Sequence, residues 1–231
     1  MGGISYVAGT RIGGGLMTAS ETSTWSQHCW NALRTVKHIV SYVTGPVHIA
    51  RRLYHQWSTV VPFPITSVLF VCHGNICRSP FAEIYFRSVM AKTGMALRVM
   101  SAGLDTTPGK PAHANTKALG RERQLSLDQH TTTQLQSELV SQSDLIVVME
   151  IAQKQRIQSL YPASNGKVVL LGYFDPKGPL EIADPYGKPM EQFQACFAQV
   201  ARCCDNLAQA LCLAREQALQ SRPHAAPSKD A

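Results

Sequence analysis

The middle of the chain alternates short, wholly apolar runs with segments whose apolar residues recur every three to four positions. The first pattern is typical of strands buried on both faces, and the second indicates helices. We expect strands at residues 67–72, 98–101, 144–149 and 167–172. We expect helices at residues 80–91, 112–123 and 132–141, in a segment that ends at Ser159, and at residues 190–219. Strands that alternate with helices predict an α/β fold, a parallel sheet with helices on both faces.

The helix expected after the first strand has recognisable ends. Ser79 is a residue type that caps helix N-termini, and Pro80 suits the first helical position, where an N–H would have no partner. Gly94 comes just past the expected end of the helix. A loop of six residues, 73–78, should therefore join the first strand to this helix.

Composition divides the chain into four parts. Residues 1–24, rich in Gly, Ser and Thr, and residues 220–231, with two prolines, are expected to be disordered tails. Residues 25–64 are expected to form a basic, amphipathic helical extension with a linker, and residues 65–219 a globular domain. The extension has two interpretations: a helical hairpin that contacts an anionic membrane through residues 25–60, or a helix pair packed on the domain or on a partner chain.

The net charge of +7 is concentrated near the N-terminus. Residues 1–64 contain one acidic residue, Glu21, and five basic ones: Arg11, Arg34, Lys37, Arg51 and Arg52. Such a balance favours anionic partners, which include phosphates, acidic lipids and nucleic acids. Because the basic segment carries no recognised nucleic-acid-binding motif, we expect no nucleic-acid partner.

The cysteines and the apolar stretches bear on location. The seven cysteines form an odd set without the paired spacing of a zinc ribbon, as expected for a reduced cytosolic protein. No signal peptide is recognisable, and no apolar stretch approaches the roughly 18 residues of a membrane-spanning helix. We expect a cytoplasmic protein, with membrane association as a hypothesis for the extension.

Cys72 ends the first expected strand, six residues before Arg78. In an open parallel sheet, ligands bind at the carboxyl ends of strands, and a helix N-terminus offers free N–H groups to an anion. A thiol is a useful nucleophile at neutral pH only if its pKa is lowered, which a helix N-terminus and a nearby guanidinium both do. One loop could therefore hold a phosphate between the sulfur and a bidentate arginine. The Ser79 hydroxyl could donate to the thiolate, and the Asn75 side chain could brace the loop.

The segment Cys72-His73-Gly74-Asn75-Ile76-Cys77-Arg78-Ser79-Pro80 resembles the signature loop of the low-molecular-weight protein tyrosine phosphatases. The resemblance covers about residues 65–215 and includes Ser101-Ala102-Gly103, the segment Ser143–Glu150 and Asp184-Pro185-Tyr186. It implies a four-stranded, flavodoxin-like parallel sheet and catalysis without a metal or other cofactor. It also implies a phosphate-binding loop made of His73, Gly74, Asn75, Ile76, Cys77 and Ser79, with Cys72 and Arg78 as catalytic residues.

The same resemblance assigns the remaining roles. Asp184 would protonate the leaving phenolate and then activate the water that hydrolyses a cysteinyl-phosphate. We prefer Asp184 to Asp175, which also precedes a proline, because Tyr186 matches the family's aromatic position. Cys77 is expected to form a reversible disulfide with Cys72. Since residues 104–108 contain no aromatic residue, Leu104 and Tyr186 are expected to line the substrate cleft.

The segment around Asp184 resembles bacterial members that act on tyrosine kinases controlling exopolysaccharide export. A phosphotyrosine protein, and such a kinase in particular, is therefore the expected partner. Three alternatives remain on this fold. The first is an arsenate reductase, but that chemistry needs relay cysteines, which residues 144–190 lack. The second is a protein-arginine phosphatase, but such enzymes tend to have Thr at the position of Ile76. The third is a non-catalytic phosphate-binding module, which would have no need of the acid Asp184.

Overall fold

A computed structural model describes residues 64–220 of the protein. The expected tail at residues 1–24 and the expected extension at residues 25–64, apart from Pro64, lie outside the described residues. The expected C-terminal tail at residues 220–231 also lies outside them, apart from Gln220, which ends the last helix.

Four parallel strands form one sheet in the order β2-β1-β3-β4. They are β1 (Ser67–Cys72), β2 (Arg98–Gly103), β3 (Leu145–Val148) and β4 (Val168–Leu170). This arrangement confirms the predicted fold class. The order places β1 and β3 in the interior of the sheet, where all of their residues are buried. Burial on both faces explains why these strands, apart from Ser67, are apolar in sequence.

Within residues 64–220, five α-helices and two short 3-10 turns connect and cover the strands. The α-helices are α2 (Arg78–Met90), α3 (Ala114–Glu122), α4 (Ser137–Ser141), α5 (Ile151–Leu160) and α6 (Met190–Gln220). The 3-10 turns are η1 (Pro162–Ser164) and η2 (Leu171–Phe174). In the described part of the chain, no helix is both long and apolar enough to cross a bilayer.

Two expectations about helices were wrong. Cys77, not Ser79, is the N-cap of α2, and its side chain makes no capping hydrogen bond. Ser79 lies inside the first turn, and its hydroxyl contacts the sulfur of Cys72 instead of capping the helix. The helix expected at residues 132–141 is only α4, because the chain before it pairs with the end of β2. There Gly103 N donates to Thr133 O and Leu135 N donates to Gly103 O, each at 2.8 Å.

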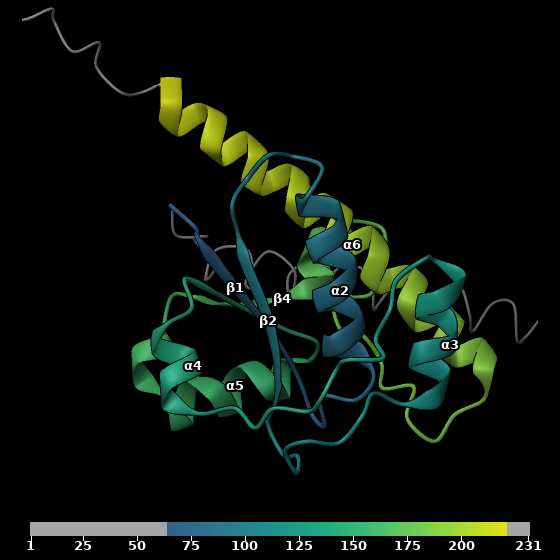
Figure 1. Ribbon diagram of the computed structural model, residues 1–231. Coiled ribbons are helices and arrows are strands. Elements are labelled where there is room, and N and C mark those ends of the chain that lie inside the picture. The colour runs from purple at the N-terminus through teal and green to yellow at the C-terminus, as the bar shows by residue number, and fades with distance from the viewer. Residues whose placement is uncertain (1–63, 221–231) are drawn as a thin grey trace, which may run out of the picture. The chain divides into compact units, whose positions relative to one another are not determined.

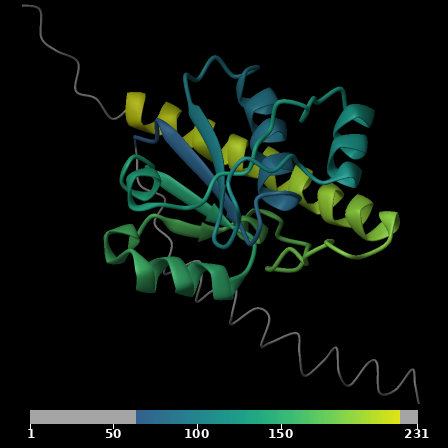
Figure 2. The ribbon, with the colours of Figure 1, turned by 60° about the horizontal axis from the view of Figure 1, so that its bottom comes forward.

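Helices cover both faces of the sheet, with α2 and α6 on one and α4 and α5 on the other (Figures 1 and 2). Alternation along β1 divides the core in the same way. Phe70 points into the cluster that contains Phe81 of α2 and Phe197 of α6, whose rings stack with centroids 4.1 Å apart. Val71 points into the second cluster, with Ile157 of α5. The loop after β1 is thus held on a rigid central strand.

Candidate active site

The loop between β1 and α2 turns its carbonyl groups outward. The carbonyls of Cys72, His73 and Ile76 accept hydrogen bonds at 2.9 Å from main-chain N–H groups of residues 104, 105 and 113. The carbonyl of Asn75 accepts from His130 Nε2, also at 2.9 Å. In a trans peptide the N–H points opposite to the carbonyl. The N–H groups of residues 73, 74, 76 and 77 are therefore directed to the inner side of the loop, as an anion requires.

Asn75 fixes this conformation from behind. Its φ of 52° lies in the left-handed region that Asn tolerates, and its side chain is fully buried. The amide nitrogen donates to Ser79 Oγ and Ser101 Oγ at 2.9 Å, and the amide oxygen accepts from Thr133 N at 2.9 Å. Every polar group of the Asn75 side chain thus has a partner, which makes a single loop conformation favourable.

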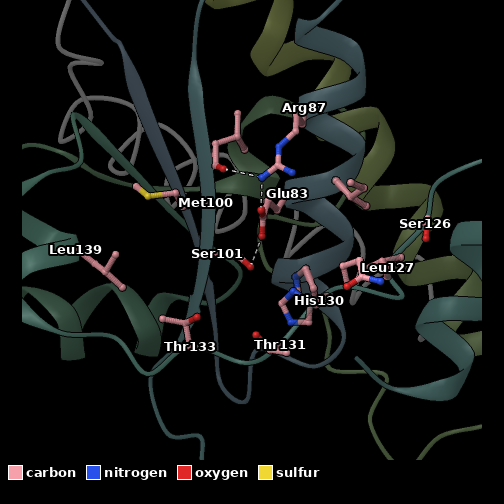
Figure 3. A pocket seen from close by; sticks show the side chains of 14 residues that line it. Glu83, Arg87, Met100, Ser101, Ser126, Leu127, His130, Thr131, Thr133 and Leu139 are labelled. Atoms are coloured by element: carbon pink, nitrogen blue, oxygen red, sulfur yellow. Dashed lines mark hydrogen bonds and ion pairs between the residues drawn. The ribbon is translucent and has the colours of Figure 1, made fainter. Parts of the chain in front are cut away.

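The network continues away from the loop. Ser101 donates to Glu83, which also pairs with Arg87 of the same helix, as Figure 3 shows. These residues line a cavity of about 430 Å³ behind the loop, together with His130 and Thr133. This cavity is larger than the one at Cys72. Its polar groups belong to residues that support the loop, and Cys72 does not line it.

Gly103, at the end of β2, allows the loop to lie close to the sheet. A Cβ at this position would come within 2.9 Å of the His73 carbonyl oxygen and 3.1 Å of Asn75 Cβ. Both atoms belong to the loop, whose backbone is already fixed by the bonds described above. A side chain here would push the loop out of place, so the Ser-Ala-Gly sequence has a physical reason.

The thiol of Cys72 lies at the base of the loop, next to Ser79. Cys72 Sγ and Ser79 Oγ are 3.0 Å apart, and the cysteine is 2% exposed. Because Ser79 Oγ accepts from Asn75, its own hydrogen is available to the sulfur or to the Ala102 carbonyl, 3.3 Å away. The first turn of α2 therefore directs a hydroxyl donor and the positive end of its dipole toward the sulfur.

Arg78, the first residue of α2, is buried and held on one side by its partners. Its NH1 group pairs with Glu150 and donates to the Ile182 carbonyl at 2.9 Å, and NH2 donates to Asp184 Oδ2 at 2.6 Å. Its Nε has no hydrogen-bond partner among the described residues. Burial opposes the charge, but Cys72, Glu150 and Asp184 outweigh it and raise the pKa of Arg78.

These groups meet in one cavity of about 110 Å³. It is lined by Cys72, His73, Gly74, Ile76, Cys77, Arg78, Asp184 and Tyr186. The segment between η2 and α6 supplies the last two residues, and Asp184 Oδ1 accepts from Tyr186 N at 3.2 Å. Residues 106 positions apart in sequence, Arg78 and Asp184, are thus in direct contact.

Not every residue singled out from the sequence reaches this cavity. Asn75 and Ser79 support it from behind. Leu104 does not line it: the side chain is 6% exposed and packs in the cluster on the α4 and α5 face. Asp175 is also buried elsewhere, where it accepts from Lys177 N and Gly178 N and pairs with Arg202. Of the two Asp-Pro pairs, only the one at Asp184 contributes to the cavity.

Cys77 lines the cavity beside Cys72, and no disulfide joins the two. Burial, together with the nearby Cys72 and Asp184, raises the pKa of Cys77 to about 12. At neutral pH this side chain is therefore a thiol and a poor nucleophile.

Sequence reasoning missed the residues that hold the machinery. Glu150 lies two residues beyond the end of β3 and contacts Arg78; its place near the carboxyl end of a strand was a usable signal. Ser101, a polar residue inside an apolar strand, was a weaker one. Nothing local marks His130 as the partner of the Asn75 carbonyl, because that contact joins segments 55 residues apart.

Comparison with known proteins agrees with this geometry. The sequence model of the "Low molecular weight phosphotyrosine protein phosphatase" family matches residues 67–218. Wzb of Escherichia coli K12, a low molecular weight protein-tyrosine-phosphatase, is 39% identical over 145 residues, which are 63% of this chain and 95% of Wzb. The "Probable low molecular weight protein-tyrosine-phosphatase EpsP" of Ralstonia nicotianae is 38% identical over 141 residues, 61% of this chain and 92% of the relative.

A solved structure on the same fold is that of the YwlE arginine phosphatase from Geobacillus stearothermophilus. It is 28% identical, with a TM-score of 0.61 over 70% of this chain and 99% of that chain. The fold is therefore common to enzymes named for different phosphorylated residues. On the family match and the two relatives, the chain belongs to the low molecular weight phosphotyrosine protein phosphatase family.

Proposed function

We propose that the chain hydrolyses protein phosphotyrosine through a cysteinyl-phosphate intermediate. Cys72 is the nucleophile, Arg78 binds the phosphate, and Asp184 is the general acid and then the general base. The observation that carries this proposal is that a thiol, a guanidinium and a carboxylate line one cavity of about 110 Å³ at the N-terminus of a helix. Residues 65–219 form the catalytic domain in this proposal.

The phosphate dianion is received by the inward N–H groups of the loop and by Arg78. Glu150 and the Ile182 carbonyl hold NH1, so Nε and NH2 are the edge that can bind two phosphate oxygens. NH2 is bonded to Asp184 in the free protein. A phosphate that takes NH2 therefore frees the Asp184 carboxyl to face the leaving oxygen.

The reaction then has two steps. The Cys72 thiolate attacks phosphorus, a sulfur–phosphorus bond forms, and the bond to the tyrosine oxygen breaks as Asp184 gives that oxygen a proton. In the second step the Asp184 carboxylate takes a proton from water, whose oxygen attacks phosphorus. The sulfur leaves as a thiolate, stabilised by Ser79 and the helix N-terminus, and inorganic phosphate is released.

The aromatic ring of the substrate is expected to lie between Ile76 of the phosphate-binding loop and Tyr186 of the segment before α6, both of which line the cavity. Tyr186 is 60% exposed and so presents an aromatic face to a ligand. This assignment keeps one of the two apolar contacts expected from the sequence and leaves out Leu104.

Leaving-group dependence tests the roles directly. Cys72→Ser should abolish hydrolysis of a phosphotyrosine peptide in the presence of EDTA. Asp184→Asn should slow phosphotyrosine more than p-nitrophenyl phosphate, because nitrophenolate leaves without a proton. Asp205→Asn, an exposed carboxylate of α6 bonded to Tyr85, is the matched control. Activity that survives Cys72→Ser would refute the proposal.

Phosphoarginine is the second candidate substrate, because the fold matches the YwlE arginine phosphatase. Ile76 lines the cavity, and we expect this apolar side chain to favour an aromatic ring over a guanidinium. We expect a phosphotyrosine peptide to have the higher kcat/KM, and Ile76→Thr to reduce that preference. A preference of the wild-type protein for phosphoarginine would replace the phosphotyrosine assignment.

The finer biological role is also a proposal. We infer that the substrate is a bacterial tyrosine kinase of polysaccharide export, which rests on the resemblance around Asp184 and on the similarity to Wzb and EpsP. The Cys72→Ser protein should retain the phosphorylated kinase from a cell extract of the source organism. Retention that inorganic vanadate does not compete away would count against an active-site complex.

The basic segment at residues 25–60 is proposed to bring the enzyme to an anionic membrane. The full chain should then co-sediment with vesicles that contain anionic lipid and not with neutral ones. Replacing Arg51 and Arg52 by Glu should weaken this binding without changing hydrolysis of p-nitrophenyl phosphate. Equal binding to neutral vesicles would contradict the proposal.

A further inference from the structure

His113 connects two parts of the chain that line the cavity, although it does not line the cavity itself. We propose that the His113 ring is a positioning residue that holds Tyr186 in place to receive the aromatic group of the substrate. The inference rests on the proposed function, because it assigns the source of affinity for an aryl phosphate.

The backbone of His113 is fixed by the phosphate-binding loop and by α3. Its N–H donates to the Ile76 carbonyl at 2.9 Å, and the residue is the N-cap of α3. Its ring nitrogen Nδ1 accepts from Asn115 N at 3.2 Å. An accepting Nδ1 places the hydrogen of the neutral ring on Nε2, and the capping bond sets the direction of the ring.

The ring is then held between two aromatic side chains. It stacks on Phe193 of α6, with centroids 5.0 Å apart and planes at 19°. It meets Tyr186 edge-on, with centroids 5.9 Å apart and planes at 79°. Phe193 is fully buried and packs on Phe197. The exposed Tyr186 ring is thus linked through His113 to the rigid core.

Tyr186 needs such a support because of where it lies. The segment between η2 and α6, residues 175–189, contains no helix or strand, and the side chain is more than half exposed. Ordering a free side chain on binding costs affinity, and a ring that is already held costs less. The contact between substrate and Tyr186 persists through the reaction, so its loss should raise KM and leave kcat nearly unchanged.

The alternative is a purely structural role, in which His113 only caps α3. Two substitutions separate these roles. His113→Asn keeps a capping acceptor and removes the ring, whereas His113→Phe keeps a flat ring on Phe193 and Tyr186 and removes the cap.

We expect His113→Asn to raise KM for a phosphotyrosine peptide about three- to tenfold, with kcat within about twofold of wild type. The Tm should stay within about 2 °C of wild type. His113→Phe should restore a KM close to wild type and lower the Tm by several degrees. The inference would be overturned if KM were unchanged in His113→Asn or raised in His113→Phe, because KM would then depend on the capping bond and not on the ring.

A double-mutant cycle gives an independent measurement. If His113 acts through Tyr186, His113→Asn should have no further effect on KM once Tyr186→Ala is present. Additive effects of the two changes would also overturn the inference. The proposed function fails separately, through an inactive wild-type protein or through activity that survives Cys72→Ser.

Discussion

The hydroxyl oxygen of Ser79 lies 3.0 Å from the sulfur of Cys72. The same oxygen accepts a hydrogen bond from the Asn75 amide at 2.9 Å, so the Ser79 hydrogen is available to the sulfur, which is nearer than the Ala102 carbonyl at 3.3 Å. The nucleophile is therefore supported by a donor that is itself oriented by a buried network. A helix that merely began at Ser79 could not provide this, because a capping hydroxyl would face the main chain.

Ser79→Ala should reduce kcat/KM about 10- to 100-fold, since a hydrogen bond to a charged group contributes roughly 1.5–3 kcal/mol. The loss should include the second step, where the sulfur leaves as a thiolate. Steady-state and burst kinetics with p-nitrophenyl phosphate measure both effects. Ser88→Ala, in the same helix but bonded to the Tyr85 carbonyl, is the control. Wild-type rates in the Ser79 variant would show that the sulfur does not depend on this donor.

Glu150→Ala should weaken phosphate binding by about tenfold or more, because NH1 of Arg78 would lose the partner that orients the guanidinium. The inhibition constant of inorganic phosphate reports this without a chemical step. Glu138→Ala removes an acidic residue of α4 and should leave the constant unchanged. An unaltered inhibition constant in the Glu150 variant would mean that Ile182 and Asp184 suffice to hold Arg78.

Asp144→Asn should destabilise the fold without affecting the site. Asp144 Oδ2 accepts from the main-chain N and the hydroxyl of both Thr66 and Ser67, at 2.8–2.9 Å. Partial burial raises its pKa, but these four bonds outweigh burial and lower it. At pH 7 we expect a loss of about 1–3 kcal/mol in the free energy of unfolding.

The sign of the pH dependence follows from the lowered pKa of Asp144. A carboxyl whose folded-state pKa is depressed stabilises the fold above its unfolded pKa, about 3.9, and loses that contribution as pH falls through the folded value. Urea unfolding of both proteins should therefore give a difference that is constant from pH 7 to pH 5 and shrinks below about pH 4. A difference that grows on acidification would contradict the stabilising role of the ionised Asp144 carboxylate.

Closure of the expected disulfide between Cys72 and Cys77 should be slow at neutral pH. Because burial raises the pKa of Cys77 to about 12, little of it is the thiolate that must attack an oxidised Cys72. After brief peroxide treatment and a pH jump, the rate should rise about tenfold per pH unit between pH 7 and 9. Alkylation and mass spectrometry follow the reaction, with Cys212→Ser as control. A rate independent of pH would place the attacking thiolate elsewhere.

The parts of the site that were predictable from the sequence are local. Four consecutive apolar residues before Cys72, Val68 to Val71, specify a buried central strand, and the spacing to Arg78 needs only one loop and one helix start. Asp184 lies more than 100 residues beyond Arg78, and only the family resemblance pointed to it. Once the strands are parallel, Glu150 at the carboxyl end of β3 follows from topology.

The remaining features depend on contacts that no local pattern records. The sequence predicts that Leu104 lines the cleft. In the structure Gly103 pairs with residues 133 and 135, and the Leu104 side chain is directed into the core. The same pairing shortens α4, because those residues bond to the end of β2 instead of forming helical turns. The contacts of His130 Nε2 with the Asn75 carbonyl and of the His113 N–H with the Ile76 carbonyl likewise join segments far apart in sequence.

The most direct test of the central claim is to trap the phosphorylated enzyme. In Asp184→Asn, mixed with p-nitrophenyl phosphate and quenched in acid, we expect intact-protein mass spectrometry to detect one added phosphoryl group and peptide mapping to locate it on Cys72. The group should be absent from the variant that also carries Cys72→Ala, which has no side-chain nucleophile at this position. A phosphoryl group on another residue, or turnover without any adduct on Cys72, would contradict the assignment of Cys72 as the nucleophile.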